Sequence, residues 1–410
     1  MASDAGIYQK IRPLREYRDE AWKCLRCGIC RMVNPERVRS QKWSDQCPAG
    51  TRFLFEAYFG SGKQEMLRAL TTSPPELVLS ERLRHIIYTC TLCGACQASC
   101  NYIKDLEPCN ASVALREYAV REGWGPLPEH EPLIKSILNY DNPWLQPRAT
   151  RAKWARRGKE KLGVRDASSE QVQVLYYPGC TASYDPVIQG VARQVVRLLG
   201  AAGVDFGILG KDEVCCGSTI LRVGDRGNFE KVRVKNTESL NKTGARIMVT
   251  ACAGCYSTLK HEYGKDLRPE VVHIVEFVDQ LIQEGRLKPV RPVRRKVTYH
   301  DPCHLGRYCG VYDPPRRILA SIPGLEFREM ERIRDWAWCC AAGGGVRTAF
   351  PEELAAWAAR LRLEEARDTG ADTLVTACPF CEQNLGETAK GLGGHIGVVD
   401  ILEMVAASVE

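Results

Sequence analysis

Long apolar runs are absent from this chain: nowhere do about 18 apolar residues stand together, the length that crosses a bilayer as a helix. The first twenty residues hold neither an apolar stretch nor a cleavage pattern, so we expect no secretory leader. A strong excess of one charge is also missing, with 57 Lys and Arg against 50 Asp and Glu. No recognised nucleic-acid-binding module accompanies this small basic excess, which argues against a nucleic-acid partner. These absences predict a cytoplasmic protein that reaches the inner face of a membrane only through another protein.

Cysteine, in contrast, is abundant, with 20 residues in a chain of 410. The apolar fraction of 44% and the charged fraction of 26% are otherwise ordinary for a globular protein of two or three domains. Disulfide-rich scaffolds are usually short and secreted, whereas this chain is long and shows no leader. We therefore expect reduced thiols that bind metal.

Two runs near the N-terminus, CLRCGIC and CTLCGACQASC, have the C-x2-C-x2-C spacing of bacterial ferredoxins. Three thiolates spaced in this way on a tightly curled loop can hold three corners of a cubane [4Fe-4S] cluster. In two-cluster ferredoxins the fourth ligand comes from the other run. The first ferredoxin set is therefore expected to be Cys24, Cys27, Cys30 and Cys100, and the second ferredoxin set Cys90, Cys93, Cys96 and Cys47.

Two alternatives remain open at these runs. Structural zinc usually takes two separated C-x-x-C pairs with four ligands in total, so two triplets with two single cysteines favour iron–sulfur. Cys100 is followed by Asn101 and not by the proline of the ferredoxin run, and Cys109 competes with it as the fourth ligand. We favour Cys100 and expect Cys109 to be a buried thiol.

A pattern of five cysteines occurs twice in the second half of the chain. Its order is a single cysteine, an adjacent pair and a C-x-x-C, and the flanking residues repeat as well: VLYYPGC matches VTYHDPC, and IMVTACAGC matches TLVTACPFC. Such a recurrence indicates an internal duplication. The same comparison predicts that His273 and His395 are equivalent, structural positions. The first repeat set is Cys180, Cys215, Cys216, Cys252 and Cys255, and the second repeat set is Cys303, Cys339, Cys340, Cys378 and Cys381.

Short apolar strands alternate with helical patterns in the second half of the chain, which predicts α/β repeats with a largely parallel sheet. Each C-x-x-C then stands where a strand ends and a helix begins, the usual functional edge of such sheets. The patterns of the N-terminal part are mainly helical, so the expected fold class is α+β overall. We expect a helical ferredoxin-type domain (1–140), a basic, solvated linker (141–170), and two repeats (171–290 and 291–410).

Adjacent cysteines suit a single tetrahedral ion poorly, and five thiolates exceed the four of a cubane, so the spacing leaves open an unusual cluster or a cubane with a free thiolate. The pattern resembles the cysteine-rich CCG domain of heterodisulfide reductases, and nearly the whole chain resembles the D subunit of these enzymes. The resemblance implies one noncubane [4Fe-4S] cluster in each repeat, held by its five cysteines. It also implies that the two clusters face each other across a cavity in which a substrate disulfide binds. One departure from the motif is Ala341, which stands where the first repeat has Gly217.

We therefore predict an iron–sulfur electron-transfer subunit in which two cubane clusters pass electrons to two noncubane clusters. The noncubane pair would reduce, or reversibly oxidise, a disulfide/thiol pair. Cys180 and Cys303 are the candidate catalytic cysteines. His304 is the candidate proton donor, because a histidine beside a redox centre can supply protons near neutral pH, and His300 is the second choice. The glycines at 343–345 lack a following Lys-Ser/Thr, so we expect close packing against a cluster and not phosphate binding.

The alternative is a relay with no substrate of its own, placed between a dehydrogenase, reductase or cytochrome partner and quinone or ferredoxin. In either case we expect partners in a redox complex: a flavoprotein, a ferredoxin-like protein or a membrane haem b subunit. A small disulfide is the expected substrate of the enzyme. Cys309 has no counterpart in the first repeat and is expected to be a free thiol.

Overall fold

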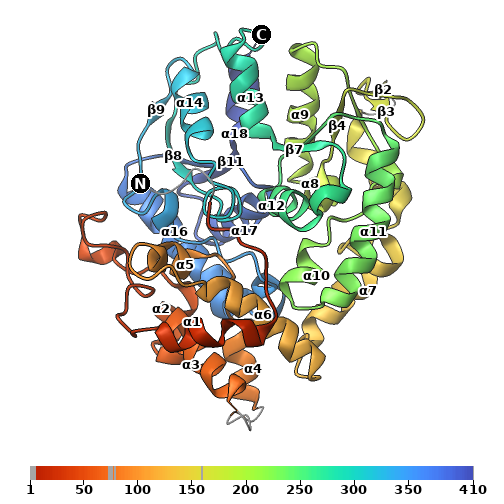
Figure 1. The fold of residues 1–410 in the computed structure, drawn as a ribbon. Coiled ribbons are helices and arrows are strands. Elements are labelled where there is room, and N and C mark those ends of the chain that lie inside the picture. Colours follow the sequence, from red (N-terminus) through yellow and green to blue (C-terminus); the bar gives the residue numbers. More distant parts are fainter. Residues whose placement is uncertain (1–5, 73–76, 78–79, 158–159, 410) are drawn as a thin grey trace.

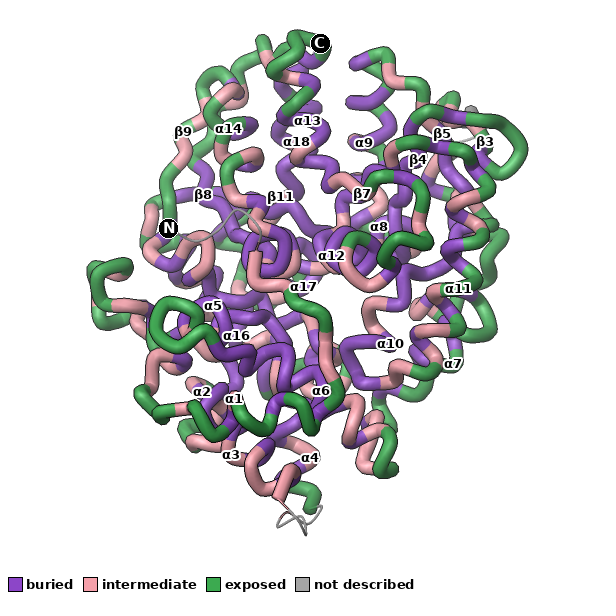
Figure 2. The backbone as a smooth tube through the Cα atoms, viewed as in Figure 1, coloured by how far each residue is buried: buried purple, intermediate pink, exposed green. Residues whose placement is uncertain are grey.

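The structure, a computed structural model, describes residues 6–72, 77, 80–157 and 160–409. Figure 1 shows three parts packed together: a helical N-terminal part in red and orange, a sheet with its helices in yellow and green, and a second sheet with its helices in cyan and blue. Figure 2 shows that the interior strands are buried, whereas much of the outer loops is exposed. Within the described ranges, no helix combines the length and the apolar character needed to cross a membrane.

The N-terminal part is built from short helices, as its sequence patterns predict. Local signals mark their starts: the Ser80 side chain accepts a hydrogen bond of 3.1 Å from the Leu83 N–H, and Pro108 occupies a first turn. The core of this part also takes in Val346 and Leu354, which fastens it to the second repeat. The helices are α1 (Arg18–Lys23), α2 (Pro48–Phe53), α3 (Gly60–Thr71), α4 (Glu81–Tyr88), α5 (Ala95–Asn101), α6 (Pro108–Arg121) and α7 (Glu131–Tyr140).

The first repeat is a parallel sheet with the strand order β3-β5-β4-β6-β7. Its central strands are buried except at Ile247, the first residue of β6, as continuous apolar runs in a parallel sheet should be. The strands are β3 (Arg165–Asp166), β4 (Val174–Tyr176), β5 (Phe206–Ile208), β6 (Ile247–Thr250) and β7 (Glu270–His273). The helices are α8 (Gly179–Tyr184), α9 (Gln189–Ala201), α10 (Ser218–Arg222), α11 (Arg226–Lys242), α12 (Ala253–Glu262) and α13 (Ile274–Gln283).

The second repeat has the same topology: its order β9-β8-β10-β11 matches β5-β4-β6-β7, and every pair is parallel. The predicted α+β fold with duplicated α/β units is therefore confirmed. The strands are β8 (Lys296–His300), β9 (Glu326–Phe327), β10 (Thr373–Thr376) and β11 (Gly397–Asp400). The helices are α14 (Asp313–Ser321), α15 (Val346–Ala349), α16 (Trp357–Asp368), α17 (Pro379–Gly391) and α18 (Ile401–Ser408).

The strand register corrects one equivalence that the sequence suggested. His273 pairs with Thr250, and at the matching place of the second sheet Asp400 pairs with Thr376. Both residues cap the helix that follows, because the side chains accept hydrogen bonds from backbone N–H groups. The counterpart of His273 is therefore Asp400, and the match to His395 was wrong.

The segment expected to be a solvated linker is partly built into the first repeat. It contains the antiparallel ribbon of β1 (Arg156–Arg157) and β2 (Glu160–Lys161), and its end supplies the edge strand β3. Arg151 and Trp154 are each only 1% exposed, which departs from the expected solvated character. The boundaries of the linker and of the repeats stay a prediction.

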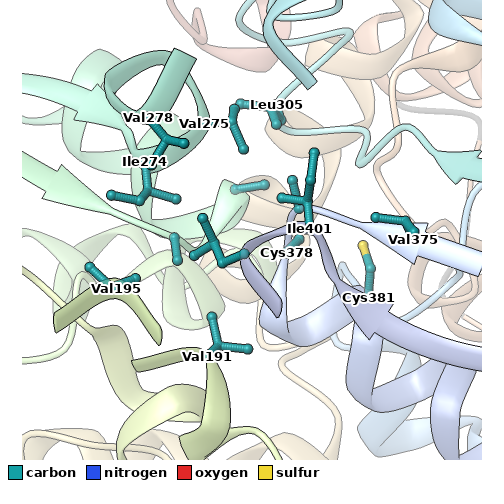
Figure 3. Packing of buried hydrophobic residues seen from close by; sticks show 14 of the residues in the cluster. Val191, Val195, Ile274, Val275, Val278, Leu305, Val375, Cys378, Cys381 and Ile401 are labelled. Carbon is teal, nitrogen blue, oxygen red and sulfur yellow. The ribbon is translucent and has the colours of Figure 1, made fainter. Parts of the chain in front are cut away.

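The two repeats share one hydrophobic core. Figure 3 shows Val191 and Val195 of α9 with Ile274 and Val278 of α13 in the same cluster as Ile401 of α18. Helices α13 and α14 also pack against each other across the boundary between the repeats. Burial of these side chains holds the repeats in a fixed relation, which is what a site shared between them requires.

Candidate functional site

Four cysteines follow four parallel strands at the points where the strands end. Cys180 lies in α8 after β4, and Cys303 follows β8. Cys252 and Cys378 are the N-terminal caps of α12 and α17, directly after β6 and β10. The carboxyl edge of a parallel sheet is the usual place for a site, and a helix N-terminus favours a thiolate because of its partial positive charge.

One cavity of about 260 Å³ lies between the two repeats, and cysteines of both line it. The Sγ atoms of Cys216 and Cys255 are 3.4 Å apart, and those of Cys340 and Cys381 are 3.3 Å apart. Both separations exceed a disulfide bond of about 2.0 Å. The cavity contains nine of the ten repeat cysteines: Cys180, Cys215, Cys216, Cys252, Cys255, Cys303, Cys340, Cys378 and Cys381.

The two repeat sets meet inside this cavity. The thiols of Cys252 and Cys378 are hydrogen-bonded to each other, although the two residues belong to different repeats. Hydrogen bonds from Cys215 and Cys255 lower the pKa of Cys216 to about 6, against the opposing effect of burial. A hydrogen bond from Cys339 lowers the pKa of Cys303 well below its usual value, and His304 adds to the effect. These contacts favour the thiolates of Cys216 and Cys303, the form that binds metal, and they raise the pKa of the partner thiols Cys255 and Cys339.

The tenth repeat cysteine, Cys339, faces the N-terminal part. A hydrogen bond between Cys339 and Cys93, helped by the positive charge of Arg307, lowers the pKa of Cys93 to about 6. Cys339 is also hydrogen-bonded to Cys303 in the cavity wall. The second repeat set and the second ferredoxin set are therefore in direct contact.

The first ferredoxin set surrounds a small cavity near the surface. Cys24, Cys27, Cys30 and Cys100 all line it, and Cys27 is exposed. Cys109 does not line it: its Sγ lies 3.1 Å from the Tyr308 hydroxyl, in the interior. Of the two candidates for the fourth ligand, the structure brings Cys100 to the set.

The second ferredoxin set gathers around a buried lysine. Lys63 donates a hydrogen bond of 2.6 Å to the Tyr58 carbonyl, and the nearby Cys90, Cys47 and Cys96 thiols interact with its charge. Burial by itself would lower the pKa of Lys63, but these thiols outweigh it and raise the pKa. Burial raises the pKa of Cys47 to about 12, and the ammonium group of Lys63 opposes that rise.

Ala341 keeps the turn that Gly217 makes in the first repeat. Its φ is +60°, against +77° for Gly217, so both residues adopt the left-handed conformation. The backbone N–H of each donates to the sulfur two residues before it, at 3.3 Å to Cys339 and at 3.5 Å to Cys215. The departure from the CCG motif therefore leaves the cysteine pair in the same arrangement.

Gly343 and Gly344 pack against the loop that carries Cys90, and Gly345 packs against His130. Gly344 has φ +66°, and a Cβ there would lie 2.8 Å from the Cys90 carbonyl oxygen. Arg116 binds both segments, because it donates to the Gly344 and Cys90 carbonyl oxygens at 2.6 and 2.5 Å. The close packing that the sequence suggested is therefore present, and the glycine backbone packs against the backbone of the loop that carries Cys90.

Replacing Gly344 with alanine is expected to lower the free energy of unfolding by about 2 to 4 kcal/mol, from left-handed strain and overpacking combined. Anaerobic urea unfolding measures the effect. The control is Gly200→Ala in α9, where a Cβ meets no other atom within 4 Å. Equal stability of the two variants would contradict the argued packing.

Two buried arginines at the cysteine sets were not predicted. Nη2 of Arg151 lies 3.4 Å from Cys180 Sγ and 2.5 Å from the Glu213 carboxylate. Arg307 donates at 2.7 Å to the Cys93 carbonyl. Arg151 belongs to a basic run that looks solvated, and Arg307 follows Cys303 without any spacing signal, so the sequence held no usable sign of either role.

His304 is where the sequence placed it, in the cavity wall. Its Nδ1 is 3.9 Å from Cys303 Sγ, and its buried Nε2 has no hydrogen-bond partner among the described residues. His300 does not line the cavity but lies behind it, close to Cys340 and Cys381. Cys309 is a free thiol with its Sγ 3.4 Å from His261 Nε2.

The donor sets fit iron–sulfur clusters. All twenty cysteines are free, and thirteen of them line one of two cavities. Soft thiolate ligands select iron–sulfur, zinc or Cu(I), and a four-ligand zinc site would leave one thiol of each repeat set without a role. The cations at Lys63, Arg151 and Arg307 offset the charge of thiolate groups.

Family models match the same segments. A cysteine-rich domain model, CCG, matches residues 174–260 and 297–386, and a 4Fe-4S dicluster domain model matches residues 20–102. Among solved structures, glutamate racemase RacE1 from Bacillus anthracis covers 58% of this chain and 79% of its own, at 13% identity and a TM-score of 0.30, a similarity without bearing on function.

Curated relatives extend the similarity over almost the whole chain. The chain is 34% identical to the D subunit of dihydromethanophenazine:CoB–CoM heterodisulfide reductase from Methanosarcina barkeri, covering 93% of this chain and 92% of that protein. It is 31% identical to EtfAB:quinone oxidoreductase of Syntrophomonas wolfei, over 96% of this chain and 60% of that protein. It is 32% identical to the B subunit of fumarate reductase (CoM/CoB) from Methanothermobacter marburgensis, over 99% of this chain and 76% of that protein. The chain therefore belongs to the family of iron–sulfur oxidoreductase subunits that includes the D subunit of heterodisulfide reductase.

Proposed function

We propose that the four cysteine sets bind four [4Fe-4S] clusters, with cubane clusters on the ferredoxin sets and noncubane clusters on the repeat sets. Cys100 would be the fourth ligand of the first ferredoxin set, because Cys100 and not Cys109 lines that cavity. An iron–sulfur cluster supplies one-electron transfer when it is bound. With all four sets loaded, the chain would carry about sixteen iron atoms.

The cysteine sets form a succession of close contacts from the surface to the shared cavity. Gly60 lies between the first and the second ferredoxin set, where there is no room for a side chain. A Cβ there would lie 3.0 Å from Cys96 Cβ and 3.3 Å from Cys30 Cβ. The contact between Cys93 and Cys339 then joins the second ferredoxin set to the second repeat. This succession supports entry of electrons at the first ferredoxin set and delivery at the cavity.

The shared cavity carries the proposal that the chain reduces, or reversibly oxidises, a small disulfide. Reduction breaks the S–S bond and forms two thiols, which takes two electrons and two protons. Cys180 and Cys303 come from different repeats, so one electron can arrive from each side. His304 would give one proton to a product thiolate, because its Nε2 is without a partner among the described residues, and solvent would supply the other.

Two measurements test this function. Iron and acid-labile sulfide are determined on anaerobically purified protein, and about sixteen of each per chain is expected. Reduced methyl viologen with a series of small disulfides then tests for turnover. Zinc in place of iron, or ten repeat cysteines paired as disulfides, would overturn the proposal.

A relay without its own substrate is the second candidate. The observation that favours it is the similarity to a protein named as a quinone oxidoreductase, since relatives of one architecture carry different reactions in their names. A loaded protein that is reduced quickly by a redox partner, but turns over no disulfide, would support the relay.

A partner redox protein is proposed to dock at the first ferredoxin set, and any contact with a membrane would come through that partner. Of thirteen large hydrophobic side chains that are exposed among the described residues, five lie within three positions of a cysteine of this set. No other cysteine set in the described part of the chain has such neighbours. The five are Trp22, Leu25, Met32, Tyr102 and Ile103.

Replacing Leu25 with aspartate is expected to slow reduction by a protein donor at least tenfold, because a charge replaces apolar surface at the docking face. The donor in the experiment is a reduced bacterial two-cluster ferredoxin, followed by stopped-flow absorbance. The control is Leu145→Asp, since Leu145 is 62% exposed and Leu25 is 63% exposed. Reduction by methyl viologen should be unchanged in both variants. Equal rates of reduction by ferredoxin in the Leu25 and Leu145 variants would contradict docking at the first ferredoxin set.

A further inference from the structure

The two repeats differ at one buried position behind the cavity. The matched segments VLYYPGC and VTYHDPC place Tyr177 in the first repeat where the second has His300. Tyr177 is fully buried, and its hydroxyl donates a hydrogen bond of 2.5 Å to the Val214 carbonyl oxygen. His300 is 1% exposed, and its Nε2 has no hydrogen-bond partner in the described part of the structure. A buried polar atom without a partner requires an explanation.

A neighbouring arginine determines which nitrogen of His300 carries the proton. The Nε–H of Arg362 donates to His300 Nδ1 at 3.1 Å. Arg362 is itself held by the Glu365 carboxylate at 2.8 Å and by the Arg332 carbonyl oxygen at 2.9 Å. A neutral imidazole has one N–H, so an accepting Nδ1 leaves the proton on Nε2.

The imidazole ring of His300 lies beside two sulfur atoms. A ring nitrogen of His300 and the Sγ atoms of Cys340 and Cys381 all lie within 4.8 Å of one another. Hydrogen bonds from Cys339 and Cys381 lower the pKa of Cys340 well below its ordinary value, and His300 contributes in the same direction. No comparable donor group stands at this place in the first repeat, because Tyr177 gives its hydroxyl proton to a carbonyl oxygen.

These three residues could also be taken as ligands of one metal ion. Ligation through Nε2 would require the proton to sit on Nδ1, where it would point at the Arg362 N–H. Two donors would then face each other in a buried place, which is unfavourable. The hydrogen bond from Arg362 therefore argues against His300 as a ligand and leaves its Nε2–H available as a donor.

We propose that His300 is a positioning residue whose Nε2–H, without a partner among the described residues, donates an N–H···S hydrogen bond at the Cys340–Cys381 pair when a cluster is bound there, and that this makes the second repeat the first of the two to accept an electron. A hydrogen bond to a ligating sulfur stabilises the more negative, reduced state. The electron comes from a reduced redox partner by way of the second ferredoxin set, which contacts this repeat through Cys93 and Cys339. The inference rests on the proposed iron–sulfur function and adds an order of reduction to it.

The experiment compares His300→Tyr, which installs the residue of the first repeat, with Tyr177→Phe as the matched control. Anaerobic redox titration followed by electron paramagnetic resonance measures the potential of each centre. In His300→Tyr one signal is expected to shift to lower potential. At a fixed solution potential, the ratio of reduced to oxidised centre for that signal then falls at least tenfold. The other signals, and all signals of Tyr177→Phe, should stay where they are in the unmodified protein.

A second measurement needs no variant and so does not depend on how well His300→Tyr folds. Pulsed resonance on protein labelled with ¹⁵N-histidine should show a weakly coupled nitrogen and an exchangeable proton at the second repeat. A strongly coupled, directly ligating nitrogen would overturn the inference, as would full iron content with unchanged potentials in His300→Tyr. Unmodified protein without iron and sulfide would instead defeat the proposed function, and this inference with it.

Discussion

Replacing Cys303 with serine is expected to abolish disulfide turnover while the protein stays folded and its ferredoxin sets remain reducible. Cys303 lines the shared cavity and is hydrogen-bonded to Cys339, so its loss breaks the second repeat set at the cavity wall. A serine hydroxyl is a hard ligand and a poor substitute for a soft thiolate. Iron content should fall by about four of about sixteen atoms per chain.

Turnover with reduced viologen and a disulfide, together with iron analysis, measures both effects. The matched control is Cys309→Ser, a change of the same chemistry six residues away at a thiol outside the cavity. This control should keep both iron and turnover. Full activity in the Cys303 variant would show that substrate reduction does not take place at this cavity.

Replacing Arg151 with methionine is expected to lower the free energy of unfolding by about 3 to 5 kcal/mol, because it leaves the Glu213 carboxylate buried without its partner. The side chains of both residues are only 2% exposed. Burial raises the pKa of Glu213, and the hydrogen bonds from Arg151 oppose that rise. Anaerobic denaturant unfolding measures the loss. The control is Arg165→Met, whose side chain is 41% exposed in its ion pairs, and a change below about 1 kcal/mol is expected there.

A double variant separates the two effects of Arg151, on the free energy of unfolding and on the resonance signal of the first repeat set. Arg151→Met with Glu213→Leu removes both buried charges and should recover most of the lost stability. The hydrogen bond of 3.4 Å from Arg151 to Cys180 stays absent, so the resonance signal of the first repeat should remain altered. A double variant with the unmodified signal would show that Arg151 acts on the fold alone.

Local spacing was enough to predict the duplication and the positions of the repeat cysteines at the ends of strands. Three thiols two residues apart, or a strand that ends at a C-x-x-C, are properties of a few neighbouring residues, and parallel strands bring their carboxyl ends to one edge by topology. For this reason the sequence placed Cys180, Cys252, Cys303 and Cys378 at the ends of strands, where the structure has them. Local spacing could not predict that Ala341 keeps the left-handed turn, because the identity of a single residue does not reveal its backbone conformation.

The sequence by itself indicated four thiol groups, the α+β class and the two-fold repeat, because these follow from residue order and periodicity, but it left Cys100 and Cys109 as alternatives in the first group. Only the tertiary structure decided which groups touch: Cys93 meets Cys339, and Arg151 reaches Cys180. It also placed Arg362 as a hydrogen-bond donor to His300 Nδ1. Such contacts join residues far apart along the chain, and they depend on how the shared core orients the repeats and the helical part against each other. No local pattern encodes that orientation, since it results from the packing of many side chains at once.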